Sequence, residues 1–216
     1  MSQTVCFITR IGNSAFKYTM EIVVHNSQVL SSTNDIYQQY SVPVWEIEIQ
    51  SDVVDSPEFT QSLAVDSNFV VSQAHNSELR SVFAGEGVVK DFLSVSHKEK
   101  LLDIALDHPA TRPRFNMSQQ HYQTRAGWLS TILRDQAGFS MTPHIDNSHV
   151  VMHMIVNLVQ DNETATDFYL FDSKEPVYRA PTKRNHGVIF VNTPGAVHAI
   201  NGITHTRWIW YASVLL

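Results

Sequence analysis

The sequence predicts a mainly β protein of the α+β class, whose C-terminal half forms a barrel or jelly roll. From Trp128 to the C-terminus, short stretches of β-forming residues follow one another, and polar turns separate them. Such close spacing is typical of barrels and jelly rolls. Strands are expected at residues 129–133, 139–145, 150–158, 167–171, 188–191, 197–200 and 207–215.

A helix is predicted directly before these strands, over residues 96–108. Ser96 and Glu99 have the spacing of a capping box, in which hydroxyl and carboxylate bind backbone N–H groups at a helix start. Pro109 ends the apolar face that follows, because proline cannot continue a helix. Residues 88–216 are therefore expected to form the barrel core with its preceding helix, after a seam at residues 85–87.

Residues 1–87 are predicted to be a β-rich region whose role the sequence does not assign. Strands are expected at residues 18–24 and 42–49, and the second alternates apolar and acidic side chains from Trp45 on. Residues 52–61 hold three acidic residues and Pro57 and are expected to form a loop. The region is interpreted as a lid, a dimerisation surface or a substrate-recognition element, and its residues favour none of these.

Composition indicates a globular, cytoplasmic protein. The chain has 216 residues, of which 43% are hydrophobic and 17% charged, enough for one good-sized core. A formal charge of −6 without a long Lys/Arg run argues against a nucleic-acid partner. The single cysteine fits a reducing compartment, and no secretory signal or membrane-spanning apolar run is seen. Composition does not predict the oligomeric state.

The segment Pro143-His144-Ile145-Asp146-Asn147 contains two residues that commonly bind metals, a histidine and an aspartate, separated by one residue. In an extended chain the side chains of residues i and i+2 project from the same face, so His144 and Asp146 are expected to converge. His198 offers a third ligand, again in a β-like run. Two imidazoles and one carboxylate, with the other positions open, are the ligand set of non-haem Fe(II) oxygenases.

The His-x-Asp/Glu pattern is weak by itself. With 11 His and 21 Asp+Glu in 216 residues, about one match is expected by chance, and the chain has two. The other match, His97-Lys98-Glu99, falls at the predicted helix start and is interpreted as part of it. His153 lies in an apolar run and is interpreted as a core histidine or as one that supports a ligand. The remaining histidines of this half are expected at the surface: His149, His186 and His205.

Together these residues resemble the Fe(II)/2-oxoglutarate-dependent oxygenases, in particular the prolyl-hydroxylase branch and the related small oxygenases of phages and marine microbes. The similarity covers residues 88–216 and consists of a strand ending in His144-Ile145-Asp146, the distal His198, and Arg207 in the last strand. It implies a double-stranded β-helix (jelly-roll, cupin-like) core with flanking helices. It also implies Fe(II) held by His144, Asp146 and His198, with 2-oxoglutarate and O₂ as cosubstrates.

The resemblance implies that Arg207 binds the distal carboxylate of 2-oxoglutarate. A buried carboxylate has to be paired, and a guanidinium can clamp it with two hydrogen bonds. Arg207 opens an otherwise apolar strand, where a charge without a partner would be anomalous. Asn157 and Arg134 lie where this branch places further cosubstrate contacts, but each is equally well explained as the end of a strand. Many members also carry a tyrosine in this pocket, for which the sequence offers no secure equivalent.

The implied reaction is hydroxylation of an unactivated C–H bond with release of succinate and CO₂, because halogenating relatives lack the carboxylate that Asp146 provides. A prolyl side chain in a protein, a free amino acid, a nucleobase or a small metabolite would each fit as substrate. Two other interpretations stay open. A cupin-like metal enzyme without 2-oxoglutarate would make Arg207 dispensable, and a non-enzymatic jelly-roll binding module would bind no metal.

Overall fold

The computed structural model describes residues 3–11, 14–36, 38–72, 77–95, 97–107 and 126–216. The strands are β1 (Gln3–Ile11), β2 (Ser14–Leu30), β3 (Val42–Ser51), β4 (Phe69–Val71), β5 (Arg80–Phe83), β6 (Gly127–Asp135), β7 (Met141–His144), β8 (Val150–Leu158), β9 (Thr166–Tyr169), β10 (Tyr178–Arg179), β11 (His186–Val191), β12 (Val197–Ile200) and β13 (Arg207–Leu215). The helices are α1 (Pro57–Ala64), α2 (Val88–Ser94) and α3 (Lys98–Asp107), with short 3₁₀ turns η1 (Gln38–Tyr40) and η2 (Asp66–Asn68).

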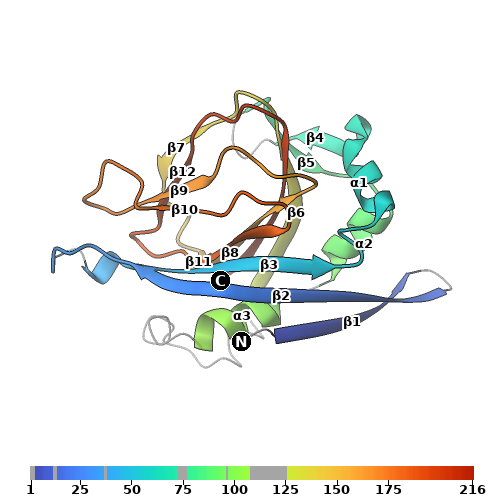
Figure 1. Ribbon diagram of the computed structural model, residues 1–216, viewed down its shortest axis with the longest axis horizontal. Coiled ribbons are helices and arrows are strands. Elements are labelled where there is room, and N and C mark those ends of the chain that lie inside the picture. The colour runs from blue at the N-terminus through green and yellow to red at the C-terminus, as the bar shows by residue number, and fades with distance from the viewer. Residues whose placement is uncertain (1–2, 12–13, 37, 73–76, 96, 108–125) are drawn as a thin grey trace.

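Strands β6 to β13 form a jelly roll of two facing sheets. Strands β6, β8, β11 and β13 belong to a nine-stranded sheet of order β1-β2-β3-β11-β8-β13-β6-β5-β4, and the others form a four-stranded sheet of order β10-β9-β12-β7. The pairs within both sheets are antiparallel. Figure 1 shows the smaller sheet stacked above the β3, β11 and β8 part of the larger one. This alternation between sheets is the double-stranded β-helix, which confirms the predicted fold class.

The strands expected from the sequence in this half are all present. Those expected at residues 150–158, 197–200 and 207–215 have the predicted ends, and the other four have shifted ends. The strand expected at residues 139–145 begins at Met141, and the one expected at residues 167–171 ends at Tyr169. Asp146 therefore lies in the loop after β7 and not in the strand. Turn geometry explains the late start of β7, because Gly138 has a φ of 90° and Phe139 N–H donates to the Gln136 carbonyl.

Residues on both sides of the expected seam at residues 85–87 share one sheet. β3 pairs with β11, and β5 pairs with β6, so the strands of residues 1–87 extend the larger sheet of the jelly roll on two sides. The N-terminal part is β-rich, as expected from its sequence. A division of function between residues 1–87 and 88–216 stays a prediction.

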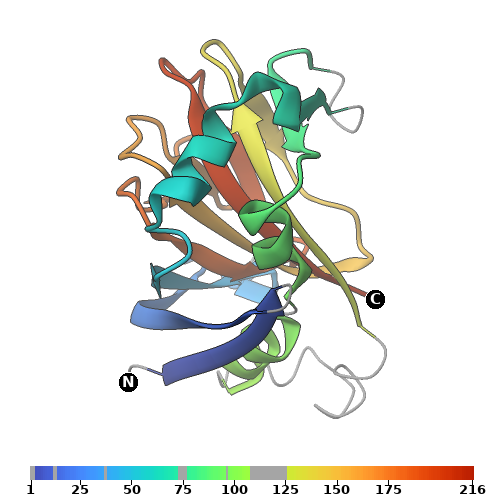
Figure 2. The ribbon, with the colours of Figure 1, turned by 90° about the vertical axis from the view of Figure 1, so that its right-hand side faces the viewer.

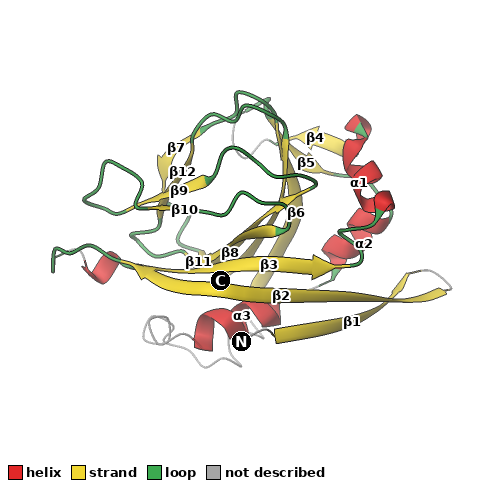
Figure 3. Ribbon diagram, viewed as in Figure 1, coloured by secondary structure: helices red, strands yellow, loops and turns green. Residues whose placement is uncertain are grey.

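Helices cover the outer face of the larger sheet and enclose its main core. Phe59 of α1, Phe92 of α2 and Leu101 of α3 pack with Trp210 of β13 and Met154 of β8. Figure 2 shows α1 and α2 lying across the strands, and Figure 3 shows the helices on the outside of the strand body. Burial of each such side chain contributes about 1.5–3 kcal/mol. This core fixes the back of the sheet whose opposite face carries the site.

The loop predicted at residues 52–61 is wrong in its second half, where α1 begins at Pro57. The hydroxyl of Ser56 accepts a hydrogen bond from Phe59 N–H, which caps the helix. Proline is favoured at the first helical position because its missing N–H has no partner there, and Glu58 suits the positive end of the helix dipole. Residues that suggest a loop in isolation thus form a helix start.

The interpretation of His97-Lys98-Glu99 as a helix start is confirmed, since α3 begins at Lys98 and Leu101 N–H donates to the His97 carbonyl. Ser96 and Pro109, the expected ends of this helix, lie outside the described residues. The ring of His97 is buried against Phe92, Trp128 and Trp210. Within the described ranges, every helix is too short or too polar to cross a bilayer.

Stability is expected to fall below pH 6.5 because of His97. Burial lowers the pKa of its imidazole from 6.5 to about 4. Between these values the unfolded chain binds a proton that the folded protein does not, so the stabilisation is complete above pH 6.5 and is lost as the pH falls toward 4. Between pH 7 and pH 4.5, His97→Phe should remove about 2 kcal/mol of this pH-dependent loss. Urea unfolding at pH 7 and pH 4.5 measures it.

His149→Phe serves as the control, because His149 is exposed. Its unfolding free energy should change with pH as in the parent protein. An unchanged pH dependence in His97→Phe would show that the buried His97 does not titrate in this range.

Candidate metal centre and the cavity beside it

The structure brings His144, Asp146 and His198 together at one end of the space between the sheets. His144 is the last residue of β7, and it stands directly opposite His198 of β12, with ring centroids 4.5 Å apart. The Nε2 atoms of His144 and His198 lie 3.9 Å and 3.4 Å from the Asp146 carboxylate oxygens. Adjacent ligands at about 2.1 Å from an ion lie about 3 Å apart, so the three atoms need only small shifts to share one metal.

Asp146 reaches this position through its loop, which Asn192 holds from the end of β11. The Asn192 side-chain amide donates to the carbonyls of Asp146, Asn147 and Val150, at 3.4, 3.0 and 3.0 Å. Val150 N–H closes the turn on the Asn147 carbonyl. The loop bound by Asn192 therefore positions the carboxylate. Its convergence with His144 had been expected from the two-residue period of a strand, which is not what places Asp146 here.

Both imidazoles present a free lone pair to this carboxylate. His144 Nδ1 is 2.8 Å from the Thr142 carbonyl, and His198 Nδ1 is 3.0 Å from the Ala196 carbonyl. A carbonyl can only accept, so each Nδ1 carries the hydrogen and each neutral ring leaves Nε2 as the basic atom. Bonds of this kind orient histidine ligands in metal sites. Two lone pairs and a carboxylate then converge where a cation would relieve their repulsion.

The charges of the group also suit a metal at neutral pH. Burial lowers the pKa of His198 to about 4, which keeps its ring neutral. Burial acts to raise the pKa of Asp146, but the hydrogen bond from His153 and the electrostatic influence of the nearby imidazoles of His153, His198 and His144 outweigh it and lower that pKa to about 2. The group thus holds one carboxylate and two imidazoles in the forms that bind cations.

His153 of β8 supports the carboxylate from behind. Its Nε2 is 3.0 Å from Asp146 Oδ2, and its ring is fully buried. On the other side Nδ1 faces the hydroxyls of Tyr211, at 2.8 Å, and Ser213, at 3.0 Å. Hydroxyls that donate to Nδ1 leave the hydrogen on Nε2, where it can bind Asp146. His153 thus supports a predicted metal ligand, which is one of the two interpretations of this residue from the sequence.

A small cavity of about 40 Å³ runs from this group between the two sheets. Its walls combine the three predicted ligands with apolar and hydroxyl side chains and end at two arginines: Arg80, Leu133, Met141, His144, Asp146, Ile155, Thr166, His198, Ile200, Arg207, Ile209 and Tyr211. Arg207, Ile209 and Tyr211 alternate along β13 and so share its inner face. The cavity therefore joins the metal-binding group to Arg207.

Two arginines share one carboxylate at the far end of the cavity. Arg80 Nη2 and Arg207 Nε lie 2.8 Å and 3.0 Å from Asp135 Oδ2. All three residues are buried, with exposed fractions of 4%, 2% and 0%. Burial lowers the pKa of Arg207, and Asp135 counteracts this. Two positive charges against one negative charge leave one positive charge at the cavity end, where an anion would be bound.

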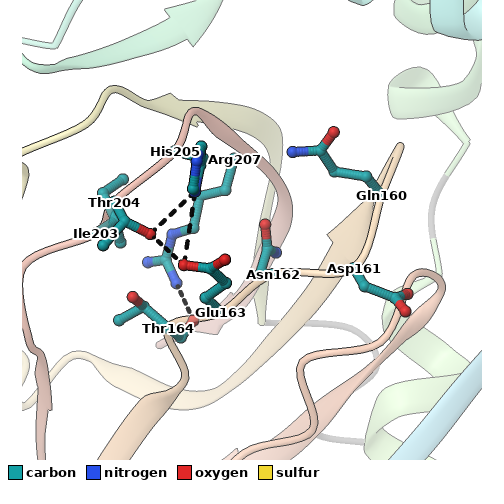
Figure 4. Close-up of a pocket in the computed structure, with 9 residues that line it drawn as sticks. All are labelled: Gln160, Asp161, Asn162, Glu163, Thr164, Ile203, Thr204, His205 and Arg207. Atoms are coloured by element: carbon teal, nitrogen blue, oxygen red, sulfur yellow. Dashed lines mark hydrogen bonds and ion pairs between the residues drawn. The ribbon is translucent and has the colours of Figure 1, made fainter.

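A larger, open pocket of about 430 Å³ lies on the other side of Arg207 (Figure 4). It is formed by two loops, residues 160–164 and residues 203–207, and Arg207 Nη1 donates to the Thr164 carbonyl at its base. In Figure 4 the side chains of Glu163, Thr204 and His205 gather at one side of the guanidinium. The predicted metal ligands do not line this pocket, so it is not where a metal-centred reaction would take place.

Asn157 and Arg134, the other two residues expected to contact a cosubstrate, do not line the cavity. The Asn157 amide donates to the carbonyls of Pro181 and His186 and accepts from Asn162. The Arg134 guanidinium binds Asp66 and lies over the ring of Phe69, on the side of β4. Both side chains connect structural elements, which agrees with their alternative explanation as strand-end residues.

Three residues of this region were not predicted from the sequence: Arg80, Asp135 and Tyr211. Tyr211 could have been found, because it follows Arg207 at an even spacing in a strand and so shares its face. It places a tyrosine on the wall of the cavity, and burial raises its pKa to about 12. Arg80 carries only a weak signal, a charge in the short apolar segment that forms β5.

No protein-family model and no curated protein sequence matches this chain. Solved structures do match. A prolyl hydroxylase from Trichoplax adhaerens, in complex with a hypoxia inducible factor oxygen degradation domain peptide fragment, is 13% identical over 72% of this chain and 75% of that chain, with a TM-score of 0.48. A Pseudomonas putida prolyl-4-hydroxylase is 12% identical over 76% and 86%, with a TM-score of 0.47. A 2OG-Fe(II) oxygenase family oxidoreductase from Burkholderia pseudomallei is 18% identical over 76% and 80%, with a TM-score of 0.38.

These structures come from the superfamily that the sequence resembles. At such low identities and TM-scores, what this chain does has to be inferred from the residues of its own site.

Asp135→Asn is expected to lower the free energy of unfolding by about 3–5 kcal/mol, because it leaves two buried guanidinium groups without their carboxylate. Urea unfolding measures the loss. Asp66→Asn is the matched control, because it breaks an arginine pair in which the carboxylate is 92% exposed. Such exposed pairs contribute at most about 1 kcal/mol. Equal losses of unfolding free energy in the two variants would contradict the pairing of two buried arginines with the Asp135 carboxylate.

Proposed function

We propose that the protein is an Fe(II)- and 2-oxoglutarate-dependent dioxygenase. The observation that carries the proposal is the charge arrangement of one continuous cavity. A divalent ion bound to the single carboxylate of Asp146 would leave one positive charge at the metal-binding end. The Arg80, Asp135 and Arg207 cluster leaves another at the far end. 2-Oxoglutarate carries two negative charges, one at each end of a short chain, and it would neutralise both.

The donor set fits Fe(II) in particular. Two imidazoles and one carboxylate on one side of an ion leave positions for a chelating cosubstrate and O₂. A metal with such open positions supplies the oxidative chemistry when bound: O₂ and 2-oxoglutarate are consumed, a C–H bond of the substrate becomes C–OH, and succinate and CO₂ are released. His144, Asp146 and His198 would hold the ion, and His153 would hold Asp146 in place.

The remaining cavity residues bind and shield the cosubstrate. Arg207 and Arg80 are placed to bind the distal carboxylate by charge-assisted hydrogen bonds, which are roughly twice as strong as neutral ones. Ile155, Ile200 and Ile209 form an apolar wall between the two charged ends. Such a wall excludes water and strengthens the electrostatic attraction at both ends.

The substrate of this proposal is a C–H bond in a peptide side chain, prolyl-like, or in a small molecule. The metal-binding group opens outward, since the side chains of His144 and Asp146 are 29% and 26% exposed. A substrate would approach from this side, while the arginines close the inner end. Succinate release with proline-containing peptides or with free amino acids distinguishes the two classes.

The first test is a titration of anaerobic, metal-free protein with Fe(II) and then with 2-oxoglutarate, followed by the visible charge-transfer band of the chelated metal. We expect a band that requires both additions. Asp146→Ala should abolish metal binding at this site and, with it, the band. Arg207→Lys should leave metal binding intact and weaken 2-oxoglutarate binding about 10-fold or more, because an ammonium keeps the charge opposite Asp135 but cannot clamp a carboxylate bidentately.

Arg134→Lys is the matched control, because Arg134 points away from the cavity. It should bind both ligands as the parent protein does. Iron binding without any response to 2-oxoglutarate would contradict the proposal in favour of a cupin-like metal enzyme. No iron binding at all would leave a non-enzymatic binding module.

A further inference from the structure

We propose that the protein has a second site for a divalent transition metal, Zn²⁺ by ligand chemistry, formed by His25, Glu48 and His186. One ligand atom from each residue lies within 4.8 Å of the other two. These residues come from β2, β3 and β11 of the larger sheet, whereas the first metal-binding group is built from β7, β12 and the loop after β7. The two groups share no residue. Imidazole and carboxylate are ligands that suit Zn²⁺.

The sheet itself brings the three side chains together. Glu48 lies on the middle strand, and His186 of β11 is its direct cross-strand partner. On the other side, the register between β2 and β3 shifts between Val24 and Asn26, which places His25 at a β-bulge. A bulge inserts one extra residue and redirects its side chain. Here it puts the His25 imidazole beside Glu48, although Glu48 pairs with Val23.

The distances are close to those of a zinc centre. Glu48 Oε2 is 2.9 Å from His25 Nε2 and 3.9 Å from His186 Nε2. Two ligands at about 2.0–2.1 Å from a tetrahedral ion lie about 3.3 Å apart, which falls between these two values. The His25 and His186 rings are nearly parallel, with centroids 5.8 Å apart. Small side-chain rotations would thus be enough to bind one ion.

The His186 ring is oriented as a metal ligand would be. Its Nδ1 is 2.9 Å from the carbonyl of Arg184, two residues before it. His144 and His198 make the same bond to the carbonyls two residues before them. A carbonyl can only accept, so His186 Nδ1 carries a hydrogen, and Nε2, the ring atom left to bind a metal, faces the Glu48 carboxylate. A cation between Nε2 and this carboxylate would bind both.

The backbone turn before His186 is fixed independently. Asn185 has a left-handed φ of 60°, and its carbonyl accepts from Ile49 N–H at 2.7 Å. Its side-chain amide donates to Asp55, and its backbone N–H donates to the Asn157 carbonyl. Asparagine tolerates this left-handed conformation better than most residues. The turn holds the Arg184 carbonyl where it orients the histidine.

Partial exposure gives an ion access and leaves room for a water as fourth ligand. The side chains of His25, Glu48 and His186 are 44%, 27% and 28% exposed. The neighbouring carboxylate of Glu46 is bound by the Tyr178 hydroxyl, at 3.1 Å, so it is engaged separately from the site. A metal here would connect β2, β3 and β11. It would stabilise the folded state by mass action, because the unfolded chain lacks the site.

The experiment is a Zn²⁺ titration of the full-length, chelator-stripped protein, with stoichiometry read by competition with a chromophoric chelator. We expect two equivalents to bind. Glu48→Gln, which keeps the shape of the side chain, should lose one equivalent, and His144→Ala should lose the other. The two substitutions combined should bind none. His205→Ala is the matched control, since His205 contacts only one carboxylate, Glu163, among the described residues, and it should keep both equivalents.

Thermal unfolding gives a second readout. Zn²⁺ should raise the melting temperature of His144→Ala, in which only the proposed second site is left, and adding Glu48→Gln should abolish that rise. His25→Asn should have the same effect and covers the case in which Glu48→Gln fails to fold. One equivalent in the parent protein, lost in His144→Ala and kept in Glu48→Gln, would overturn the second site. It would leave His25 and Glu48 as an ordinary ion pair and would leave the first site unaffected.

Discussion

Two buried arginines, Arg80 and Arg207, share one carboxylate, that of Asp135. The charge at this end of the cavity depends on this pairing of two cations with one anion. Burying an ion costs several kcal/mol unless it is paired, so two guanidinium groups cannot stay in this space without partners. Asp135 satisfies one charge and Thr164 and Phe139 provide weaker contacts. The cavity end therefore has one positive charge more than its carboxylate balances. Under the proposed function, a metal held by one carboxylate at the opposite end would make a dianion with two separated carboxylates the best complement.

This constraint also gives the N-terminal region a part in the site. Arg80 begins β5, which pairs with the end of β6 so that Arg80 lies opposite Asp135. On the far side of Asp135, β13 places Arg207 opposite the same residue. One carboxylate on a central strand is thus reached by arginines from both neighbouring strands. The jelly roll alone would supply only Arg207, so the strands before residue 88 complete the anion-binding end.

The sequence predicted those features that local chemistry and periodicity encode. The jelly-roll strands follow from their alternation and turns, and the metal-binding group follows from the ligand types of His144, Asp146 and His198. Arg80 could not be predicted, because its place depends on the pairing of β5 with β6, in which Ser81 lies opposite Arg134, 53 positions further along the chain. Arg134 and Asn157 show the reverse limit. The family resemblance implied a cosubstrate contact for each, but hydrogen bonds to Asp66 and to two carbonyls direct their side chains elsewhere.

The bond from histidine Nδ1 to the carbonyl two residues earlier links folding to ligand chemistry. His144 ends a strand, His186 begins one, and the carbonyl bound by His198 lies just before β12. Near strand ends a carbonyl can lack a partner in the sheet ladder, and an unpaired buried carbonyl is destabilising. A histidine that satisfies this carbonyl is at the same time fixed with its basic Nε2 pointing outward. The need to satisfy backbone hydrogen bonds at strand ends thus also orients histidines as metal ligands would be oriented. Where a carboxylate lies opposite such an imidazole, as Asp146 and Glu48 do, the two groups can bind one metal ion.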